Sequence, residues 1–343
     1  MLGLRCILLT HFDETFYILA FYYMQIQFLG TSSGTPTKAR NVSGLAIKKT
    51  NSKSWCLVDC GEGTQHRLLE TNLTLKNLQA IFITHIHGDH CYGLPGVLAS
   101  AAMAGRTAPL WLVAPAKIRS FVEGVIASTE LWLNFEIQFV DVAEASSLPA
   151  DLDFKLEVIQ LSHRVPSFGY AFSEKVSGRK LDADQLRKDG VPSGPLWGQL
   201  QQGRSVTLDD GRVISGEDYF LPARVSRKII IAGDNDNPDL LSEAMKNAHV
   251  LVHEATYTHD VLEKIGPGPQ HSSAKLVADS AEKNELQNLV LTHFSPRYGA
   301  QTDSAMSIND IENEARNSYS GHLFLANDLD CFELQTDGSL AKV

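Results

Sequence analysis

Short apolar runs alternate with helical or polar segments along most of the chain. The runs are rich in β-branched and aromatic residues, which is typical of buried strands. We expect strands at 24–30, 43–48, 55–58, 80–83, 110–113, 158–161, 169–172, 228–232, 249–252 and 289–292, and helices at 65–70, 94–104 and 117–128. This repetition of strand and helix predicts an α/β (α+β) fold whose ligand site lies at the carboxyl ends of the strands.

Three histidines and a carboxylate crowd together directly after the predicted strand 80–83. The segment reads His85-Ile86-His87-Gly88-Asp89-His90. Gly88 lets the chain turn sharply, so His85 and His87 can face one ion while Asp89 and His90 face a second ion close by. A polar loop with incidental histidines is the alternative, but four ligand-type side chains in six positions favour a metal site.

Other predicted strands also end in ligand-type residues. His163, Asp234, Glu254 and His293 each follow an apolar run. A lone histidine is usually an ordinary polar residue, yet repeated delivery to one rim of a sheet is what a composite metal site requires. Asp59 also ends a strand, and we expect it to support a ligating histidine rather than to bind metal itself.

Composition narrows the class of protein. The chain has 343 residues, 43% hydrophobic and 20% charged, which is ordinary for a folded enzyme. A formal net charge of −10 argues against non-specific coating of nucleic acid, so any RNA contact must be local. Five cysteines without C-x-x-C spacing argue against a disulfide framework and favour a reducing compartment, the cytoplasm.

Residues 1–23 differ from the rest of the chain. The apolar stretch 16–23 follows Asp13 and Glu14, where a signal peptide would carry positive charge, and it is too short to span a bilayer. We expect residues 1–23 to be an extension upstream of a natural start at Met24. A membrane-surface or partner segment is the alternative.

Two segments are candidates for contact with a polyanion. A glycine-rich loop at 30–41 carries Lys38 and Arg40, and such loops can surround phosphate. Residues 175–204 contain few large hydrophobic residues but several basic ones, including Arg179 and Lys180. We expect this second segment to lack the apolar surface for a core, to project as an arm and to grip a polyanion; a solvated linker is the alternative.

The histidine motif resembles that of the metallo-β-lactamase superfamily, and residues from 24 to about 334 resemble the ribonuclease Z family. The matching stretches are 30–34, 36–41, 59–65, 84–90, 163–170, 233–234, 253–256, 271–273 and 293, together with the inserted arm. The resemblance implies a four-layer αββα domain over 24–343 that carries a flexible, tRNA-binding arm at about 175–204. It also implies a cytoplasmic homodimer, not bound to a membrane, that removes the 3′ trailer from precursor tRNA. Asn235 departs from the usual threonine, and 191–195 has lost one proline.

The same resemblance assigns roles to individual residues. It implies two zinc ions per subunit, with Asp89, Glu254 and His271 as catalytic residues. The implied zinc ligands are His85, His87 and His163 for one ion, Asp89, His90 and His293 for the other, and Asp234 for both. The expected substrate contacts are Lys38, Arg40, Ser272, Ser273, Arg297, Arg179 and Lys180.

Two other functions stay open from the sequence. A superfamily hydrolase of small esters or phosphodiesters would use the same metals but would not need a basic arm. A non-catalytic RNA-binding protein would not need seven metal ligands.

Overall fold

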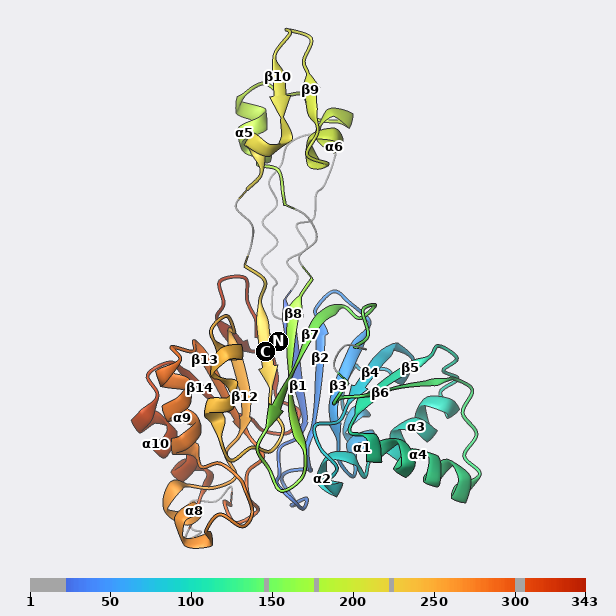
Figure 1. The fold of residues 1–343 in the computed structure, drawn as a ribbon, viewed down its shortest axis with the longest axis vertical. Coiled ribbons are helices and arrows are strands. Elements are labelled where there is room, and N and C mark those ends of the chain that lie inside the picture. Colours follow the sequence, from blue (N-terminus) through green and yellow to red (C-terminus); the bar gives the residue numbers. More distant parts are fainter. Residues whose placement is uncertain (1–22, 145–147, 176–178, 222–224, 300–305) are drawn as a thin grey trace, which may run out of the picture.

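Two β-sheets packed face to face form the body of the molecule. The computed structural model describes residues 23–144, 148–175, 179–221, 225–299 and 306–343, which excludes nearly all of the expected leader. Within these ranges the first sheet has eight strands and the second has six (Figure 1). The strand order in the first sheet is β16 (Leu340–Lys342), β15 (Cys331–Leu334), β1 (Met24–Gly30), β2 (Gly44–Lys49), β3 (Trp55–Cys60), β4 (Leu78–Phe82), β5 (Leu110–Ala114) and β6 (Ile137–Asp141). The strand order in the second sheet is β14 (His322–Leu325), β13 (Asn288–Thr292), β12 (Val250–Glu254), β11 (Lys228–Ile231), β8 (Ser167–Glu174) and β7 (Phe154–Leu161).

Alternation of side chains along each strand divides the core into three layers. Ile229 and Ile231 of β11 point into the layer between the sheets, whereas Ile230 between them packs against helices on the outer face. In β3, Cys56 faces the other sheet and Leu57 faces the helices. Both sheets are therefore apolar on both faces and need a helical layer outside.

Helices cover the outer face of each sheet. The first sheet is covered by α1 (Thr64–Leu68), α3 (Leu94–Met103) and α4 (Ala116–Thr129), and the second by α7 (Ser242–Met245), α8 (His259–Ile265), α9 (Ala274–Lys283) and α10 (Ile308–Ser318). The short helix α2 (Gly88–Cys91) follows β4. This arrangement confirms the predicted αββα fold. No helix in the described ranges is long and apolar enough to cross a membrane.

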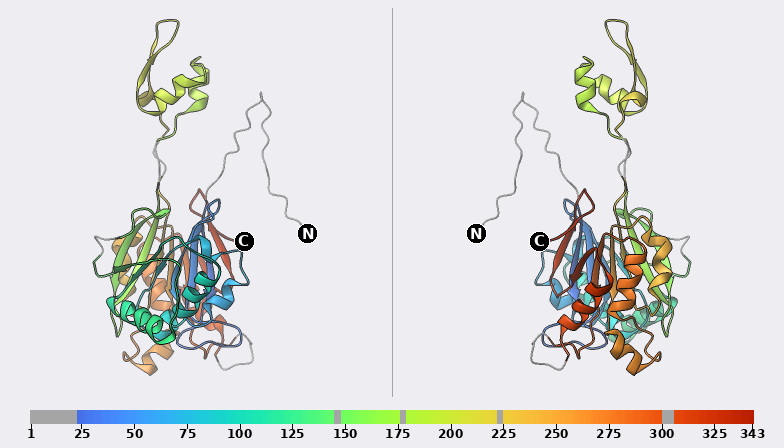
Figure 2. Two further views of the ribbon diagram at one scale, coloured as in Figure 1. Left: turned by 90° about the vertical axis from the view of Figure 1, so that its right-hand side faces the viewer. Right: turned by 90° about the vertical axis from the view of Figure 1, so that its left-hand side faces the viewer.

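A small head stands apart from the body, between β8 and β11 of the second sheet (Figures 1 and 2). It contains α5 (Ala183–Lys188), α6 (Pro195–Gln201), β9 (Ser205–Thr207) and β10 (Val213–Ser215). Its two ends lie together, because Leu221 N donates a hydrogen bond to Lys180 O at 2.7 Å. We call residues 179–221 the head.

The head has its own hydrophobic core, so the prediction that this segment lacks apolar surface is wrong. The sequence boundary at about 204 fell between α6 and β9 and left out half of the core. The buried residues are Leu186, Val191, Leu200, Val206, Leu208 and Ile214. A two-stranded hairpin packed against two short helices thus completes what the first half cannot form alone.

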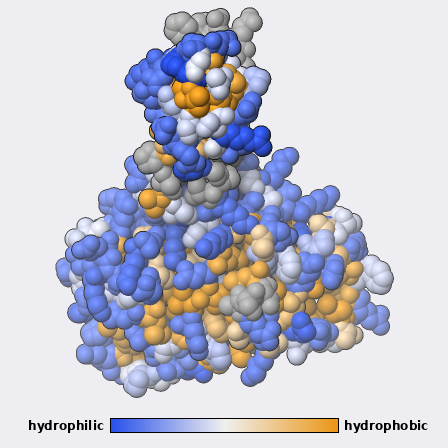
Figure 3. Space-filling model, turned by 45° about the horizontal axis from the view of Figure 1, so that its top comes forward, coloured by the Kyte–Doolittle hydropathy of each residue, from blue (hydrophilic) through white to orange (hydrophobic). Residues whose placement is uncertain are grey.

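The head is also not basic as a whole. It contains six basic and seven acidic residues. Three of the basic side chains form ion pairs within the head, namely Arg179 with Glu217, Arg187 with Asp184 and Arg212 with Asp210. Figure 3 shows a largely hydrophilic surface on the head with a small hydrophobic patch. Its positive charge is local, on the remaining Lys180, Lys188 and Arg204.

Candidate metal centre and active site

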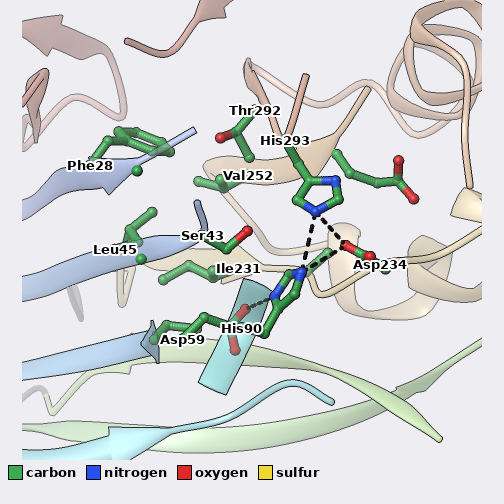
Figure 4. A pocket seen from close by; sticks show the side chains of 15 residues that line it. Phe28, Ser43, Leu45, Asp59, His90, Ile231, Asp234, Val252, Thr292 and His293 are labelled. Atoms are coloured by element: carbon green, nitrogen blue, oxygen red, sulfur yellow. Dashed lines mark hydrogen bonds and ion pairs between the residues drawn. The ribbon is translucent and has the colours of Figure 1, made fainter. Parts of the chain in front are cut away.

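The ligand-type residues that end the strands meet at one end of the body. Parallel pairing of β3 to β6 and of β11 to β14 places the carboxyl ends of these strands on the same side. Figure 4 shows His90, His293 and Asp234 pointing toward one another, with Asp59 behind His90. All seven predicted metal ligands belong to this cluster.

One group of ligand atoms comprises three imidazoles and a carboxylate oxygen. His87 Nδ1 lies 3.1 Å from both His85 Nε2 and His163 Nε2. Asp234 Oδ2 lies 3.5 Å from His85 Nε2 and 3.8 Å from His163 Nε2. The β4, β7 and β11 ends thus converge on one point.

A second group lies on the other side of Asp234. His90 Nε2 and His293 Nε2 are 3.2 Å apart, and Asp89 Oδ2 is 3.5 Å and 3.4 Å from them. The other oxygen of Asp234, Oδ1, lies 3.5 Å from His90 Nε2 and 3.4 Å from His293 Nε2. Asp234 therefore presents one oxygen to each group.

These separations fit the edges of a metal coordination shell. Four ligands about 2.0–2.1 Å from a tetrahedral ion lie about 3.3 Å from each other. A neutral imidazole has only one N–H, so rings that donate from one nitrogen to a partner outside the group direct a lone pair from the other nitrogen into it. A metal ion is the group that several such lone pairs can bind together. The residues present therefore fit a metal cofactor.

Most of the histidine rings in the two groups are held through their second nitrogen, as metal-binding histidines usually are. His90 Nδ1 donates to Asp59 Oδ2 at 2.7 Å, which is the contact expected if Asp59 supports a ligating histidine. His163 Nδ1 donates to Gln270 O at 2.7 Å. His85 Nδ1 lies 3.0 Å from Thr84 Oγ1, and His293 Nδ1 lies 3.1 Å from Thr256 Oγ1.

The backbone at the site adopts a conformation that most residues avoid. Asp59, Gln270 and His293 have φ values of 59°, 54° and 57°, in the left-handed region. Such residues cost of order 1–3 kcal/mol each and cluster at functional sites. Here they turn a ligand or its partner back toward the cluster.

Burial favours the neutral form of the His85 imidazole. Burial, followed by the positive potential of His90, His163 and His87, lowers the pKa of His85 well below its usual value. A neutral imidazole has the free electron pair that a metal needs.

His271 lies beside the cluster and contacts a buried carboxylate. Its Nδ1 donates to Glu254 Oε1 at 2.9 Å and lies 3.7 Å from Asp234 Oδ2. Burial alone lowers the pKa of His271, but the negative charges of Glu254 and Asp234 outweigh it and raise this pKa to about 9. His271 also comes within 4.8 Å of Asp234 and His293 as a third possible metal group.

The sequence missed two buried residues that organise the site. Thr256 Oγ1 contacts Glu254, His271 and His293 together. Asn235 Oδ1 accepts from Ser162 N, the residue before His163, at 3.2 Å, while its Nδ2 lies 3.0 Å from His253 Nε2. Both residues adjoin strand ends that carry ligands, and Thr256 lies in the matching stretch 253–256; these were the available signals.

The expected RNA contacts differ in how free their side chains are. Lys38 and Arg297 are exposed, and Arg297 lies over the ring of Tyr257, next to His271. Arg40 donates to Thr31 Oγ1, Ala326 O and Asn327 Oδ1, so it holds its own loop.

The remaining expected contacts are mostly occupied within the protein. Ser272 and Ser273 are fully buried, with Ser272 Oγ donating to Asn235 O and Ser273 capping α9. Arg179 is engaged by both oxygens of Glu217. The exposed Lys180 remains available for a polyanion.

Comparisons with known proteins agree with this geometry. Residues 24–177 match a family model described as anti-Pycsar protein Apyc1. The YhfI protein from Bacillus subtilis, which has a metallo-β-lactamase fold, superposes with a TM-score of 0.61 at 16% identity over 91% of this chain and 99% of that one. Human tRNase Z, short form, superposes with a TM-score of 0.59 at 24% identity over 90% and 98%. Fold and site together define a metallo-β-lactamase-fold metalloprotein.

Sequence similarity assigns the family within this class. Ribonuclease Z from Marinobacter nauticus is 48% identical over 320 residues, which cover 93% of this chain and 99% of that protein. The chain therefore belongs to the ribonuclease Z family, the endoribonucleases that process the 3′ ends of tRNA.

Proposed function

We propose that this protein removes the 3′ trailer from precursor tRNA with two zinc ions per subunit. The observation that carries the proposal is the pair of ligand groups that share Asp234, in a chain of the ribonuclease Z family. His85, His87 and His163 would hold one ion, and Asp89, His90 and His293 the other. Two zinc ions at these positions would lower the pKa of a bound water and polarise the scissile phosphodiester.

The residues around the ions then divide the remaining work. Asp89 would orient the attacking water and accept its proton. His271 protonates the departing 3′ oxygen, because Glu254 holds its Nδ1 and leaves Nε2 to face the substrate. The negative charge of Glu254, which raises the pKa of His271, favours the protonated form that a general acid needs. The phosphate stays on the trailer, so the products are a tRNA with a 3′-hydroxyl and a trailer with a 5′-phosphate.

The exposed basic residues would bind the RNA. Arg297, over the ring of Tyr257, would neutralise a phosphate near the scissile bond, and Lys38 would contact the acceptor end. Arg40, Ser272 and Ser273 would act by shaping the site, since their polar groups are used within the protein. Lys180 on the head, with Lys188 and Arg204, would grip the tRNA away from the metals, with Arg179 contributing only if it leaves Glu217.

The position of the head supports a homodimer in which the head of one subunit serves the other. In Figure 1 the head lies at the opposite end of the body from α2, which carries Asp89 and His90. An RNA held by the head is thus remote from the site of the same chain.

The free thiols of Cys56, Cys60 and Cys91 support a cytoplasmic location.

One assay tests the function directly. The purified protein should convert a 3′-extended tRNA to mature-length tRNA and a 5′-phosphorylated trailer, and a chelator should stop the reaction until zinc is restored. Rapid hydrolysis of small esters with an untouched tRNA precursor would instead favour the small-substrate hydrolase. Binding of the RNA without cleavage would favour a non-catalytic RNA-binding protein.

A further inference from the structure

The loop of residues 31–41, between β1 and β2, is bonded to one of the two ligand groups. Gly34 N donates to Asp89 Oδ2 at 2.7 Å. Ser33 N donates to Phe294 O at 3.0 Å, and Phe294 N donates to Thr31 O at 2.9 Å. Because Phe294 follows His293 directly, the loop contacts both Asp89 and the backbone that carries His293.

A single carboxylate from the far end of the chain holds both ends of this loop. Thr31 Oγ1 donates to Asp328 Oδ1 at 2.7 Å, and Asn41 N donates to Asp328 Oδ2 at 2.6 Å. The side chain of Asp328 is only 6% exposed. Asp328 lies in the turn between β14 and β15, where Leu329 N donates to Phe28 O at 2.7 Å and fixes the turn against β1.

The groups around Asp328 depend on its carboxylate as an acceptor. Arg67 Nε lies 3.5 Å from Asp328 Oδ2, and Arg40 donates to Thr31 Oγ1 at 2.7 Å. Loss of the carboxylate would leave the Asn41 N–H and the Thr31 hydroxyl without their acceptor, in a largely buried place. The loop would then lose the contact that joins its two ends.

The other ligand group has no such connection. Among the described residues, no hydrogen bond joins residues 31–41 to His85, His87 or His163. Those three rings are held by Thr84, by Gln270 and by each other. A disturbance of the loop should therefore reach the two groups unequally.

We propose that Asp328 is a positioning residue for the second metal, acting through the 31–41 loop on Asp89 and His293. This inference rests on the proposed function, in which Asp89, His90 and His293 bind that metal. Partners that orient metal ligands typically contribute about 10–100-fold to metal affinity. We expect Asp328→Asn to lower the affinity for the second metal by about that factor. The affinity for the first metal, at His85, His87 and His163, should be nearly unchanged.

Titration of the metal-free protein with Co²⁺, followed by absorption and by the number of ions bound, measures the two affinities separately. Asp330→Asn is the matched control, because Asp330 lies in the same turn but contacts Asn327 N and Lys342 instead of the loop. Thermal unfolding checks that each variant is folded. If Asp328→Asn does not fold, Thr31→Val removes the hydroxyl that donates to Asp328 and accepts from Arg40, and it should produce a smaller loss of affinity that is also selective for the second metal.

The inference is supported if Asp328→Asn binds one of the two ions more weakly while Asp330→Asn binds both as tightly as the unmodified protein. Equal weakening of both ions, or no weakening, in a folded loop variant overturns it while leaving the dinuclear proposal intact. A single binding site in the unmodified protein would instead overturn the dinuclear proposal, and this inference with it.

Discussion

At the scale of single residues, the site depends on shared contacts more than on any one strong bond. Asp234 faces both ligand groups, and Thr256 contacts a carboxylate and two imidazoles. Each of these residues contacts several groups at once, so replacing one removes several contacts together.

Asp234→Ala should abolish cleavage of precursor tRNA and lower the metal content. Removing this carboxylate leaves two groups of imidazoles without the anion between them. Metal analysis of the purified variant and a cleavage assay check this. A variant that retains both ions and normal turnover would remove the dinuclear interpretation.

His271→Ala should slow cleavage of precursor tRNA by about 10²–10⁴-fold, the usual contribution of a general acid. A bis-nitrophenyl phosphate should lose much less, because nitrophenolate leaves without needing a proton. Comparing the two rates and the zinc content separates this role from the others. Equal loss on both substrates would indicate distortion of the site, and loss of an ion would make His271 a ligand.

At the scale of elements, the head is a separately packed unit. Its six buried hydrophobic residues come from both helices, the loop between them and the hairpin, and its ends meet at Lys180 and Leu221. About 40 residues is near the lower limit for a core that folds without help, so the head should be easily destabilised.

Leu200→Ala should unfold the head without harming the body. Leu200 is fully buried in the head, and such a truncation typically costs about 2–5 kcal/mol. Hydrogen exchange should rise across residues 179–221 only, and precursor tRNA cleavage should fall while hydrolysis of the nitrophenyl diester stays normal. Val213→Ala, at a residue 68% exposed in the same head, is the control and should change neither rate. A parallel fall on both substrates would show that the head supports the body.

At the scale of the whole molecule, the head and the metal centre lie at opposite ends of the body (Figure 1). Cooperation between them within one chain would require the RNA to pass along the body. Cooperation between two chains needs only a two-fold pairing that brings each head over the partner's site.

Mixing two inactive variants distinguishes these arrangements. One variant carries Asp234→Ala with an intact head, and the other lacks residues 179–221 but retains its metal ligands. If the head acts on the partner subunit, random pairing restores about one quarter of normal cleavage. If the head acts within its own chain, the mixture stays as inactive as its parts. Refolding each variant alone supplies the baseline.

Ten of the strands in the described ranges and the identity of the candidate ligands could be predicted from the sequence, because both depend on local patterns. The short strands β6, β9, β10, β14, β15 and β16 were not predicted. Apolar runs ending at His163, Asp234 and His293 indicated their places, and the spacing from His85 to His90 indicated a metal site. The resemblance to ribonuclease Z grouped the ligands as the structure groups them. Here chemistry and order along the chain were sufficient.

Asp59 was expected to support that site, but tertiary structure alone showed that Asn235, Thr256 and Asp328 also do so. Asn235 and Thr256 look like ordinary polar residues until three strand ends meet around them, and Asp328 is 287 positions away from Asn41, whose N–H it accepts. The head's core depended on a hairpin beyond the boundary that composition suggested. Sequence periodicity reports which face of an element is apolar, whereas hydrogen bonds between elements depend on the packing of the whole chain.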